Sequence, residues 1–416
     1  MRPTAAPRVL LAHPTGNEFF RQLARAWRAE QRLAELCTCL DWRGPAWLEA
    51  QLPAGLVAEL NRRGLSRATG GHVRTHPWRE AARLTATRLR GRALTRHETG
   101  VFSVDAVYRD FDRWVAHRIA RGAVTAEYAY AYEDAAADTF AAAAARGWSR
   151  VYDLPIAHWT ESRRLLAEEA ARWPEWAPTL LGPDDSGTKL ARKTQELELA
   201  THIVCPSMFV AQSLPAAVRA ARTVIVAPFG SPAPCAPREP RTPNGALRVL
   251  FAGAMTQRKG LADLFAAVRL LPAADLELVV MGSAVLALDF YRATGVRFTY
   301  EPPRPHAAVL ELMRSCDVLC LPSVVEGRAL VVQEAMSQGL PVIVTANTGT
   351  DDVVRDGENG FLVPIRSPQA LADRLAWCLA HRPQLPRMGS VAQAAAARLT
   401  WPSYVAALNT ALFPAA

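Results

Sequence analysis

Two glutamates with seven residues between them, Glu326 and Glu334, are the acidic pair best spaced to do chemistry in this chain. The apolar run at 317–321 predicts a buried strand, and the helix formers at 329–338 predict a helix that ends at Gly339. Ligands of open α/β sheets bind outside the carboxyl ends of the strands, where both carboxylates could accept hydrogen bonds from the hydroxyls of one sugar or ribose. The alternative is that Glu326 is a solvated loop residue and Glu334 an exposed helix position.

The sequence around this pair resembles a known signature. The letters EGRALVVQEAMSQGLPVIVT at 326–345 are similar to the E-x7-E motif of retaining glycosyltransferases of glycosyltransferase family 4, and the resemblance continues through 347–349 and 356–364. It implies an α/β protein of the GT-B fold, with two Rossmann-like doubly wound domains facing each other across a cleft. It also implies a nucleoside diphosphate sugar as donor substrate, with Glu334 on the ribose and Glu326 on the sugar.

A second segment resembles the donor-diphosphate loop of the same family. The letters RVLFAGAMTQRKG at 248–260 form a strand, a small-residue turn at Gly253 and a basic pair, Arg258 and Lys259, that opens a helix. The resemblance implies that this pair neutralises the pyrophosphate. Many relatives carry an arginine where this chain has Ala254, so Arg258 must supply that charge here.

The turn after Glu326 departs from the family pattern. Relatives commonly read EGFG, whereas this chain reads EGRA, with Arg328 and Ala329 at the third and fourth positions. The backbone amides of Gly327, Arg328, Ala329 and Leu330 can still point at the donor, but the sugar pocket is altered. The resemblance therefore leaves the choice of donor open.

The N-terminal half offers its own candidates. A strand at 8–12 precedes a loop in which Gly16 lets the backbone approach a ligand. His158 follows the end of a later strand, near the position from which relatives present a histidine to the transferred sugar, although Asp153 lies closer to that strand end. The alternative for His158 is a packing or hydrogen-bonding role beside Trp159.

The order of elements predicts two domains. Residues 1–230 are expected to form the acceptor-side Rossmann-like domain, and the proline-rich stretch at 231–246 a linker. Alternating strands and helices at 247–395 predict the nucleotide-sugar domain. The last segment, 396–416, resembles the terminal helix that crosses back onto the N-terminal domain.

Positive charge is concentrated in residues 62–96, which hold ten arginines and one acid, Glu80. Such a segment could bind an anionic phospholipid surface, a lipid-diphosphate acceptor or nucleic acid, or it could be a solvated helical face. Nucleic acid is the weakest of these, because no zinc finger, helix-turn-helix or aromatic-interleaved basic motif accompanies the charge. Binding to an anionic phospholipid surface or a lipid-diphosphate acceptor is the preferred interpretation, because the family that the sequence resembles often acts on lipid-linked acceptors.

Composition favours a cytoplasmic enzyme. The chain has 416 residues, half of them hydrophobic, and shows neither a signal peptide nor an apolar run long enough to span a bilayer. Its seven cysteines are dispersed and odd in number, which favours a reducing compartment and makes zinc improbable. We therefore expect no cofactor and no metal, at most a peripheral association with the inner face of the plasma membrane, and no nucleic-acid partner.

These observations predict a retaining glycosyltransferase that moves a sugar to an acceptor hydroxyl, in the synthesis of a surface polysaccharide or glycolipid. Its acceptor would be a saccharide or a lipid-linked saccharide. Two alternatives, a nucleotide-sugar epimerase and a phosphorylase, would share the fold. A noncatalytic partner subunit is a third alternative, because Ala254 and Arg328 depart from the family pattern.

Overall fold

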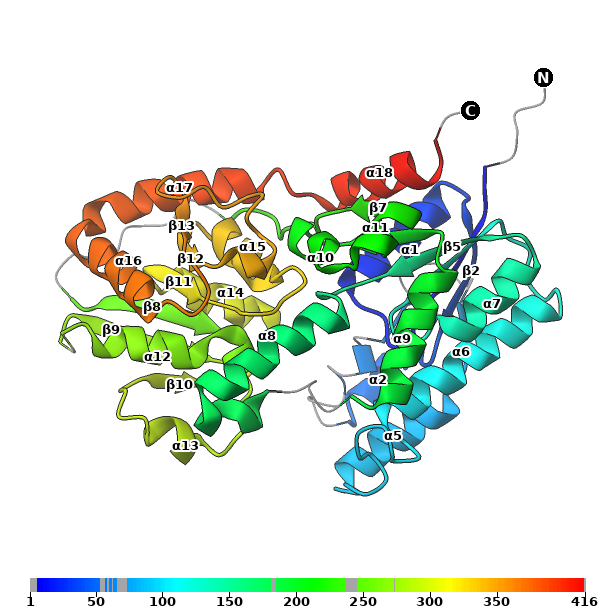
Figure 1. The fold of residues 1–416 in the computed structure, drawn as a ribbon, viewed down its shortest axis with the longest axis horizontal. Coiled ribbons are helices and arrows are strands. Elements are labelled where there is room, and N and C mark those ends of the chain that lie inside the picture. Colours follow the sequence, from blue (N-terminus) through cyan, green and yellow to red (C-terminus); the bar gives the residue numbers. More distant parts are fainter. Residues whose placement is uncertain are drawn as a thin grey trace.

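The computed structural model describes residues 6–52, 57, 60, 61, 63–65, 73–180, 185–235, 245–272 and 274–414. They form two lobes, each built on a twisted parallel sheet with helices on both faces (Figure 1). Within the described residues, no helix is long and apolar enough to cross a membrane.

The N-terminal sheet has seven parallel strands in the order β3-β2-β1-β4-β5-β6-β7. Its strands are β1 (Val9–Ala12), β2 (Leu33–Thr38), β3 (Val73–Thr75), β4 (Tyr128–Tyr132), β5 (Ser149–Asp153), β6 (His202–Cys205) and β7 (Thr223–Val226). The helices around it are α1 (Glu18–Ala29), α2 (Ala46–Glu49), α5 (Trp78–Arg88), α6 (Val104–Ala120), α7 (Ala137–Ala145), α9 (Gly187–Leu199), α10 (Met208–Ser213) and α11 (Ala216–Ala221). Strands buried on both faces read as continuous apolar runs, as VLLA does in β1.

The C-terminal sheet has six parallel strands in the order β10-β9-β8-β11-β12-β13. Its strands are β8 (Leu247–Ala252), β9 (Leu276–Met281), β10 (Thr299–Glu301), β11 (Val318–Leu321), β12 (Val342–Val344) and β13 (Gly360–Leu362). Its helical segments are η2 (Gln257–Lys259), α12 (Leu261–Arg269), α13 (Leu288–Arg292), α14 (His306–Arg314), α15 (Leu330–Ser337), η3 (Ala346–Thr348), α16 (Pro368–Ala380), η4 (Arg382–Gln384) and α17 (Leu385–Ala396). The order in which the chain adds strands reverses between β8 and β11, and such a switch point is where these folds bind ligands.

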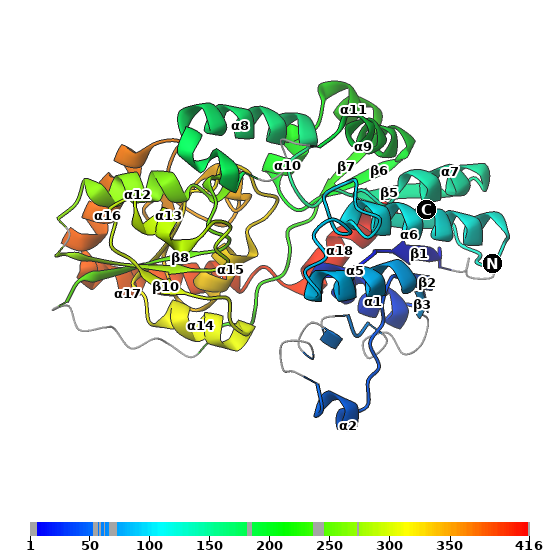
Figure 2. The ribbon, with the colours of Figure 1, turned by 90° about the horizontal axis from the view of Figure 1, so that it is seen from below.

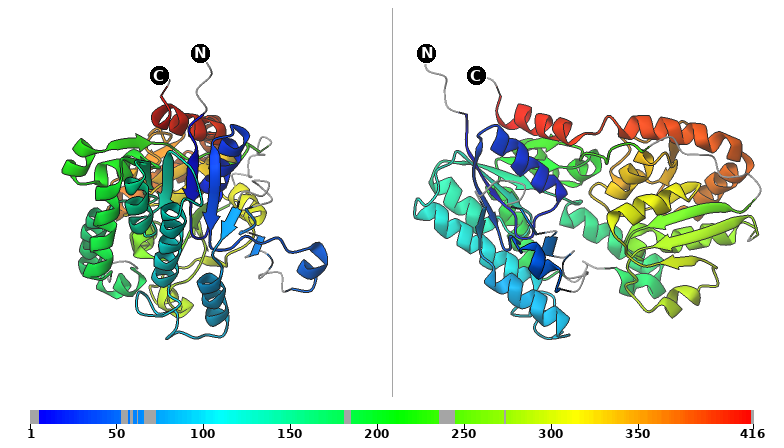
Figure 3. Two further views of the ribbon diagram at one scale, coloured as in Figure 1. Left: turned by 90° about the vertical axis from the view of Figure 1, so that its right-hand side faces the viewer. Right: turned by 180° about the vertical axis from the view of Figure 1, so that it is seen from behind.

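Two helical segments pack on the lobe opposite to the one that their place in the chain suggests. The last helix, α18 (Trp401–Leu412), lies beside α1 (Figure 3). There Trp27 Nε1 donates to Asn409 Oδ1 over 2.8 Å. In the other direction, α8 (Trp159–Arg172) and the short η1 (Pro174–Thr179) extend from the N-terminal sheet onto the C-terminal lobe, on the side of α12 (Figure 2).

Candidate active site

Three predicted site residues meet in one cluster. Lys259 Nζ lies 2.5 Å from Glu326 Oε1, and Arg258 Nη1 lies 3.2 Å from Glu326 Oε2. Burial alone would raise the pKa of the Glu326 carboxyl, but the charges of Lys259 and Arg258 outweigh burial and hold the pKa below its ordinary value. The Glu326 carboxylate is therefore ionised at neutral pH, and the cluster follows the carboxyl ends of β8 and β11.

Glycines shape the loop after β8. Gly253 has a φ of +149°, and a Cβ placed on it would lie 2.7 Å from Lys259 Cδ, so the lysine stem packs against bare backbone. Gly260 has a φ of +73°, and a Cβ there would lie 2.1 Å from the carbonyl oxygen of Pro322. A larger residue at either glycine would displace the lysine or push the two loops apart.

Gly327 lies against the backbone of the other domain. A Cβ on Gly327 would lie 1.7 Å from the carbonyl oxygen of Pro155. Two hydrogen bonds cross at the same place: Ser207 Oγ donates to Gly327 O over 2.6 Å, and Ala157 N donates to Glu326 O over 3.4 Å. The loop that carries Glu326 is therefore held against the loop that follows β5.

Arg328, predicted on the donor side, is bound within the protein. Its side chain is fully buried, and its Nη1 donates to Gly349 O over 2.8 Å and pairs with Asp352 Oδ1 at 3.0 Å. Its Nε donates to Gln333 Oε1, and the Gln333 amide donates in turn to Phe229 O over 2.9 Å. Arg328 therefore ties the start of α15 to the segment that joins the two domains.

The remaining residues of that turn have different surroundings. Ala329 N donates to Thr348 O over 2.9 Å, so this amide has a partner within the protein. Leu330 begins α15 and packs against a hydrophobic core cluster of the N-terminal lobe.

Glu334 is brought together with a residue that the sequence reasoning missed. Its Oε1 lies 3.1 Å from Nε2 of His306, the first residue of α14, and the Glu334 side chain is 19% exposed. The sequence feature that could have indicated His306 is its place among the alternating strands and helices expected at 247–395. The helix spacing alone does not pair it with a residue 28 positions away.

His158 is a buried, neutral imidazole. His158 is 3% exposed and is the N-cap residue of α8. Its Nδ1 lies 2.7 Å from Thr160 Oγ1. Burial first, and the charge of Lys193 second, lower the pKa of His158 to about 4. Within the described residues its Nε2 is buried without a hydrogen-bond partner.

Asp153, the competing residue at the strand end, sits deeper in the N-terminal core. Burial raises its pKa to about 8, the Tyr130 hydroxyl lowers the pKa by less, and the charge of Glu133 raises it further. Asp153 is therefore largely protonated at neutral pH, in contrast to Glu326.

Gly16 occupies the left-handed turn between β1 and α1, with a φ of +67°. Its N–H donates to Nδ1 of His13 over 2.9 Å, and His13 is buried, with burial lowering its pKa to about 3. A neutral His13 ring therefore shapes the loop that the sequence places toward the cleft.

A pocket of about 180 Å³ lies between the lobes beside the cluster. Arg258 and Val325 of the C-terminal lobe line it together with α8 and α9 residues. On the N-terminal side it contains the buried pair of Glu133 and Lys193, whose Oε1 and Nζ are 2.8 Å apart. The sequence reasoning missed this pair, because its partners are 60 residues apart.

The arginine-rich segment at 62–96 divides into two parts. Its first part is neutralised by acids that mostly lie outside the segment: Arg63 and Arg83 pair with Glu80, Arg74 with Glu35, and Arg79 with Asp110. In its second part, among the residues that the structure describes, four arginines are exposed and form no ion pair: Arg88, Arg90, Arg92 and Arg96. Arg62 and Arg67 lie outside the described residues. Among the described residues, the uncompensated charge is therefore concentrated at the end of α5 and just after it.

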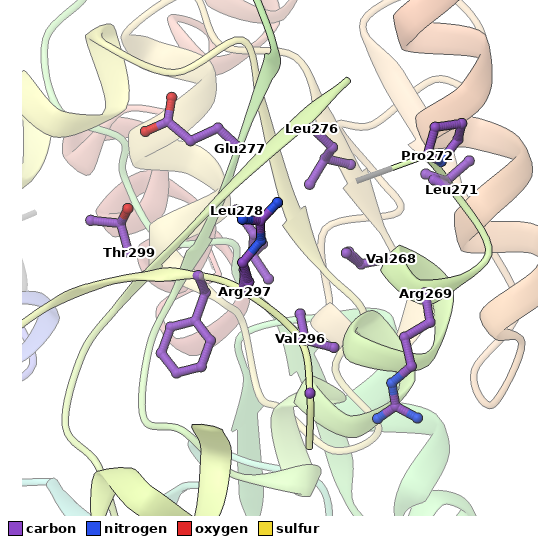
Figure 4. A pocket seen from close by; sticks show the side chains of 12 residues that line it. Val268, Arg269, Leu271, Pro272, Leu276, Glu277, Leu278, Val296, Arg297 and Thr299 are labelled. Atoms are coloured by element: carbon purple, nitrogen blue, oxygen red, sulfur yellow. The ribbon is translucent and has the colours of Figure 1, made fainter. Parts of the chain in front are cut away.

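Two other groups lie outside this cluster. His97, Glu98 and Asp185 could each bring a ligand atom to one metal ion, but Lys189 Nζ already lies 3.0 Å from Asp185 Oδ1. A second pocket, of about 410 Å³, lies at the amino ends of β9 and β10, whereas the cluster lies at the carboxyl ends of the strands. Arg269 and Arg297 are among the residues that line it (Figure 4).

Sequence comparisons match parts of this chain to known proteins. Residues 236–395 match the family model described as Glycosyl transferases group 1. The D-inositol 3-phosphate glycosyltransferase of Nocardia farcinica is 37% identical over 105 residues, which are 25% of this chain and 23% of that protein. That of Xylanimonas cellulosilytica is 34% identical over 169 residues, 38% of this chain and 40% of that protein. The matched segments thus span less than half of the length of these relatives.

Solved structures resemble nearly the whole chain. The Anabaena protein HepE, crystallised with UDP and glucose, aligns with a TM-score of 0.64 at 16% identity, over 99% of this chain and 100% of that one. Sucrose-phosphate synthase of Thermosynechococcus elongatus aligns with a TM-score of 0.65 at 16% identity, over 97% and 98%. At these identities the likeness concerns the fold. The chain therefore has the GT-B fold, with two Rossmann-like α/β domains.

Proposed function

We propose that this chain is a retaining glycosyltransferase that moves a sugar from a nucleoside diphosphate sugar to an acceptor hydroxyl. The observation that carries the proposal is the cluster of Arg258, Lys259 and Glu326 at the carboxyl ends of β8 and β11. It combines two cations suited to a diphosphate with an ionised carboxylate suited to sugar hydroxyls. The same residues lie in the segment that matches the group 1 family.

In the proposed reaction, the bond between the sugar C1 and the phosphate oxygen breaks as the acceptor oxygen bonds to C1. The acceptor proton passes to the departing phosphate oxygen on the same face of the sugar, which gives retention. Negative charge grows on the departing diphosphate, and Arg258 and Lys259 stabilise that charge in a partly buried site. These two cations would allow transfer without a metal. Glu326 would bind the sugar and Glu334 the ribose.

His158 is the proposed N-domain contact to the transferred sugar. A neutral imidazole with an unpartnered Nε2 can donate or accept one hydrogen bond. Asp153 is the alternative N-domain contact, and it is buried to a similar degree, 2% exposed against 3% for His158.

The pocket between the lobes is the proposed entry for the acceptor. It adjoins Arg258, and it is lined by polar groups of Glu133, Lys193 and Arg163 as well as by apolar side chains such as Trp159. Saccharides combine hydroxyls with apolar ring faces, so this mixed lining suits a saccharide acceptor.

The acceptor is proposed to be lipid-linked and presented at an anionic membrane surface. The stretch 78–104 holds the four arginines that form no ion pair in the described structure, and it also exposes large apolar side chains: Trp78, Leu89, Leu94, Val101 and Val104. Exposed apolar groups among basic ones favour binding at a membrane surface, where the apolar groups enter the headgroup boundary. This surface supports a cytoplasmic enzyme of surface polysaccharide or glycolipid synthesis, bound peripherally to the inner face of the membrane.

A donor screen tests the proposal. Sugar conjugates of UDP, GDP, ADP and dTDP would be compared by thermal shift, because a ligand at 100 times its dissociation constant stabilises a protein by about 2.7 kcal/mol. The stabilising donor would then be incubated with and without lipid-linked acceptors. Transfer with retention supports the proposal. Conversion of the donor without any acceptor would indicate an epimerase. Release of sugar 1-phosphate that depends on added phosphate would indicate a phosphorylase. The absence of any turnover would indicate a noncatalytic subunit.

A further inference from the structure

The segment formed by α8 and η1 belongs by contact to the C-terminal domain. Trp176 of η1 packs edge-on against Phe265, Phe290 and Tyr291, with ring centroids 5.1 to 5.8 Å apart. Tyr291 in turn donates from its hydroxyl to Met255 O over 2.7 Å, inside the loop that follows β8. An element from the N-terminal half of the chain thus forms part of the support of that loop. Figure 2 shows α8 on the side of α12.

Polar groups of this segment reach the basic turn directly. Glu169 of α8 is completely buried, and its Oε2 accepts from Nε2 of Gln257 over 2.6 Å. Gln257 is also completely buried, and it immediately precedes Arg258 and Lys259 in η2. The other carboxylate oxygen of Glu169 accepts from Arg366.

Gln257 uses its remaining polar groups as well. Its Nε2 also donates to Asp263 Oδ2 over 2.8 Å, and its Oε1 accepts from Ala262 N over 2.9 Å. Its backbone N–H donates to Thr179 Oγ1, in η1, over 3.0 Å. With these bonds the amide cannot rotate without leaving buried groups unpaired, so the turn it starts has one orientation.

We propose that Glu169 and Gln257 are positioning residues, which fix the turn that presents Arg258 and Lys259 to the donor diphosphate. This inference rests on the proposed function of those two cations. Neither Glu169 nor Gln257 is assigned a contact with the substrate. Their effect passes through the backbone of η2, whose Arg258 carbonyl also accepts from Val324 N over 2.8 Å in the loop that carries Glu326.

The test compares nucleoside diphosphate with nucleoside monophosphate binding in the full-length protein. Calorimetry would be done with UDP, GDP and ADP and with UMP, GMP and AMP. Gln257→Met keeps the volume of the side chain and removes its hydrogen bonds. In Glu169→Gln, the new amide NH2 must face an N–H donor, either that of Gln257 or that of Arg366, so one hydrogen bond is lost. Each variant should lower the ratio of diphosphate to monophosphate affinity by about 10-fold, because a misplaced cation loses its phosphate contact.

The double variant discriminates positioning from general destabilisation. If both residues act through their shared hydrogen bond, the double variant should lose little more than the larger single loss, because neighbouring groups in one network are not additive. Glu168→Gln is the matched control. Glu168 is the neighbouring residue and pairs with the same Arg366 at 2.6 Å, but it is exposed and does not touch Gln257. This control should keep the wild-type ratio.

The outcomes separate this inference from the function on which it rests. A wild-type protein that binds none of the three diphosphates would overturn the proposed function itself. Wild-type binding together with unchanged ratios in folded Gln257→Met and Glu169→Gln proteins would overturn the positioning role alone. Additive losses in the double variant would also overturn the positioning role. So would a loss in Glu168→Gln as large as that in Glu169→Gln.

Discussion

Lys259 Nζ and Glu326 Oε1 lie 2.5 Å apart, although the two residues are 67 positions apart in the chain. The contact joins the basic turn after β8 to the acidic loop after β11, two neighbouring strands of the C-terminal sheet. Glu326 is 8% exposed, and a carboxylate at that depth requires a cation partner to stay ionised. The cations that could bind a diphosphate therefore also determine the charge of the group that could bind the sugar.

Lys259→Ala and Arg258→Ala should each reduce the transfer rate constant on the order of 10²-fold, because each removes a charged donor that acts on charge growing in the transition state. Single-turnover measurements with saturating donor would report this loss. Arg292→Ala is the control, since Arg292 is exposed on the same domain and pairs with an exposed aspartate. Turnover near the wild-type level in both test variants would refute the diphosphate assignment.

Glu334→Gln should weaken the binding of a bare nucleoside diphosphate and of the complete donor alike, because the residue is assigned to the ribose. Glu326→Gln should weaken the binding of the sugar-bearing donor more than that of the bare nucleoside diphosphate, because the residue is assigned to the sugar. Calorimetry with both ligands in both variants distinguishes them. Equal losses for both ligands in both variants would contradict this division of roles.

Local patterns predicted most of the C-terminal domain. The expected strand at 317–321 and the expected helix at 329–338 match β11 and α15 to within one residue at each end. The sequence assigned both loops to one donor, but it did not predict the contact of Lys259 with Glu326. Strong local periodicity made the strand and the helix accessible.

Features that depend on distant partners were not accessible in the same way. No local pattern shows that α8 and η1 pack on the C-terminal lobe, where Trp176 of η1 joins the hydrophobic core. The arginine-rich segment read as one charged band, whereas Arg63 and Arg74 are paired with acids brought near by the fold. Arg328 read as part of the sugar pocket, yet its guanidinium is bound by Gly349 and Asp352.

Gly327→Ala should reduce transfer on the order of 10²-fold without unfolding the protein, because small displacements of reacting groups have effects of that size. The added methyl would meet a backbone carbonyl 1.7 Å away, at Pro155, so the lobes must separate there. Transfer rates and small-angle scattering would be measured together. Gly187→Ala is the control, because a Cβ there meets nothing within 4 Å. A variant with wild-type transfer and an unchanged radius of gyration would contradict the tight contact.

Asp153→Asn should remove part of the pH dependence of stability. Burial raises the pKa of Asp153 from 3.8 to about 8, so between these values the folded protein holds a proton that the unfolded chain releases. The free energy of unfolding then falls as pH rises through this interval, by up to about 1.4 kcal/mol per pH unit for one proton.

Melting curves between pH 6.5 and 8.5 would check this prediction. His158 adds the opposite trend only below pH 6.5, because its folded pKa is about 4 and its ordinary value is 6.5. Within the chosen range the wild type should lose stability relative to Asp153→Asn as pH rises. Parallel curves for the two proteins would show that Asp153 is already ionised in the fold.

Replacing Arg88, Arg90 and Arg92 with glutamine should release the protein from anionic vesicles while leaving its melting temperature unchanged, because these side chains are exposed and unpaired in the described structure. Each basic residue near an anionic surface contributes on the order of 1 kcal/mol, and the attraction fades within a Debye length, so salt should weaken wild-type binding. Cosedimentation with anionic and neutral vesicles measures both effects.

A matched control uses arginines of the same segment that are already neutralised. Arg74→Gln and Arg79→Gln remove positive charge that pairs with Glu35 and Asp110, so the exposed surface after α5 keeps its four cations. These variants should retain more vesicle binding than the triple variant. Equal partitioning to anionic and neutral vesicles, or binding that salt does not weaken, would mean that the segment is a solvated face, and a soluble acceptor would then be favoured.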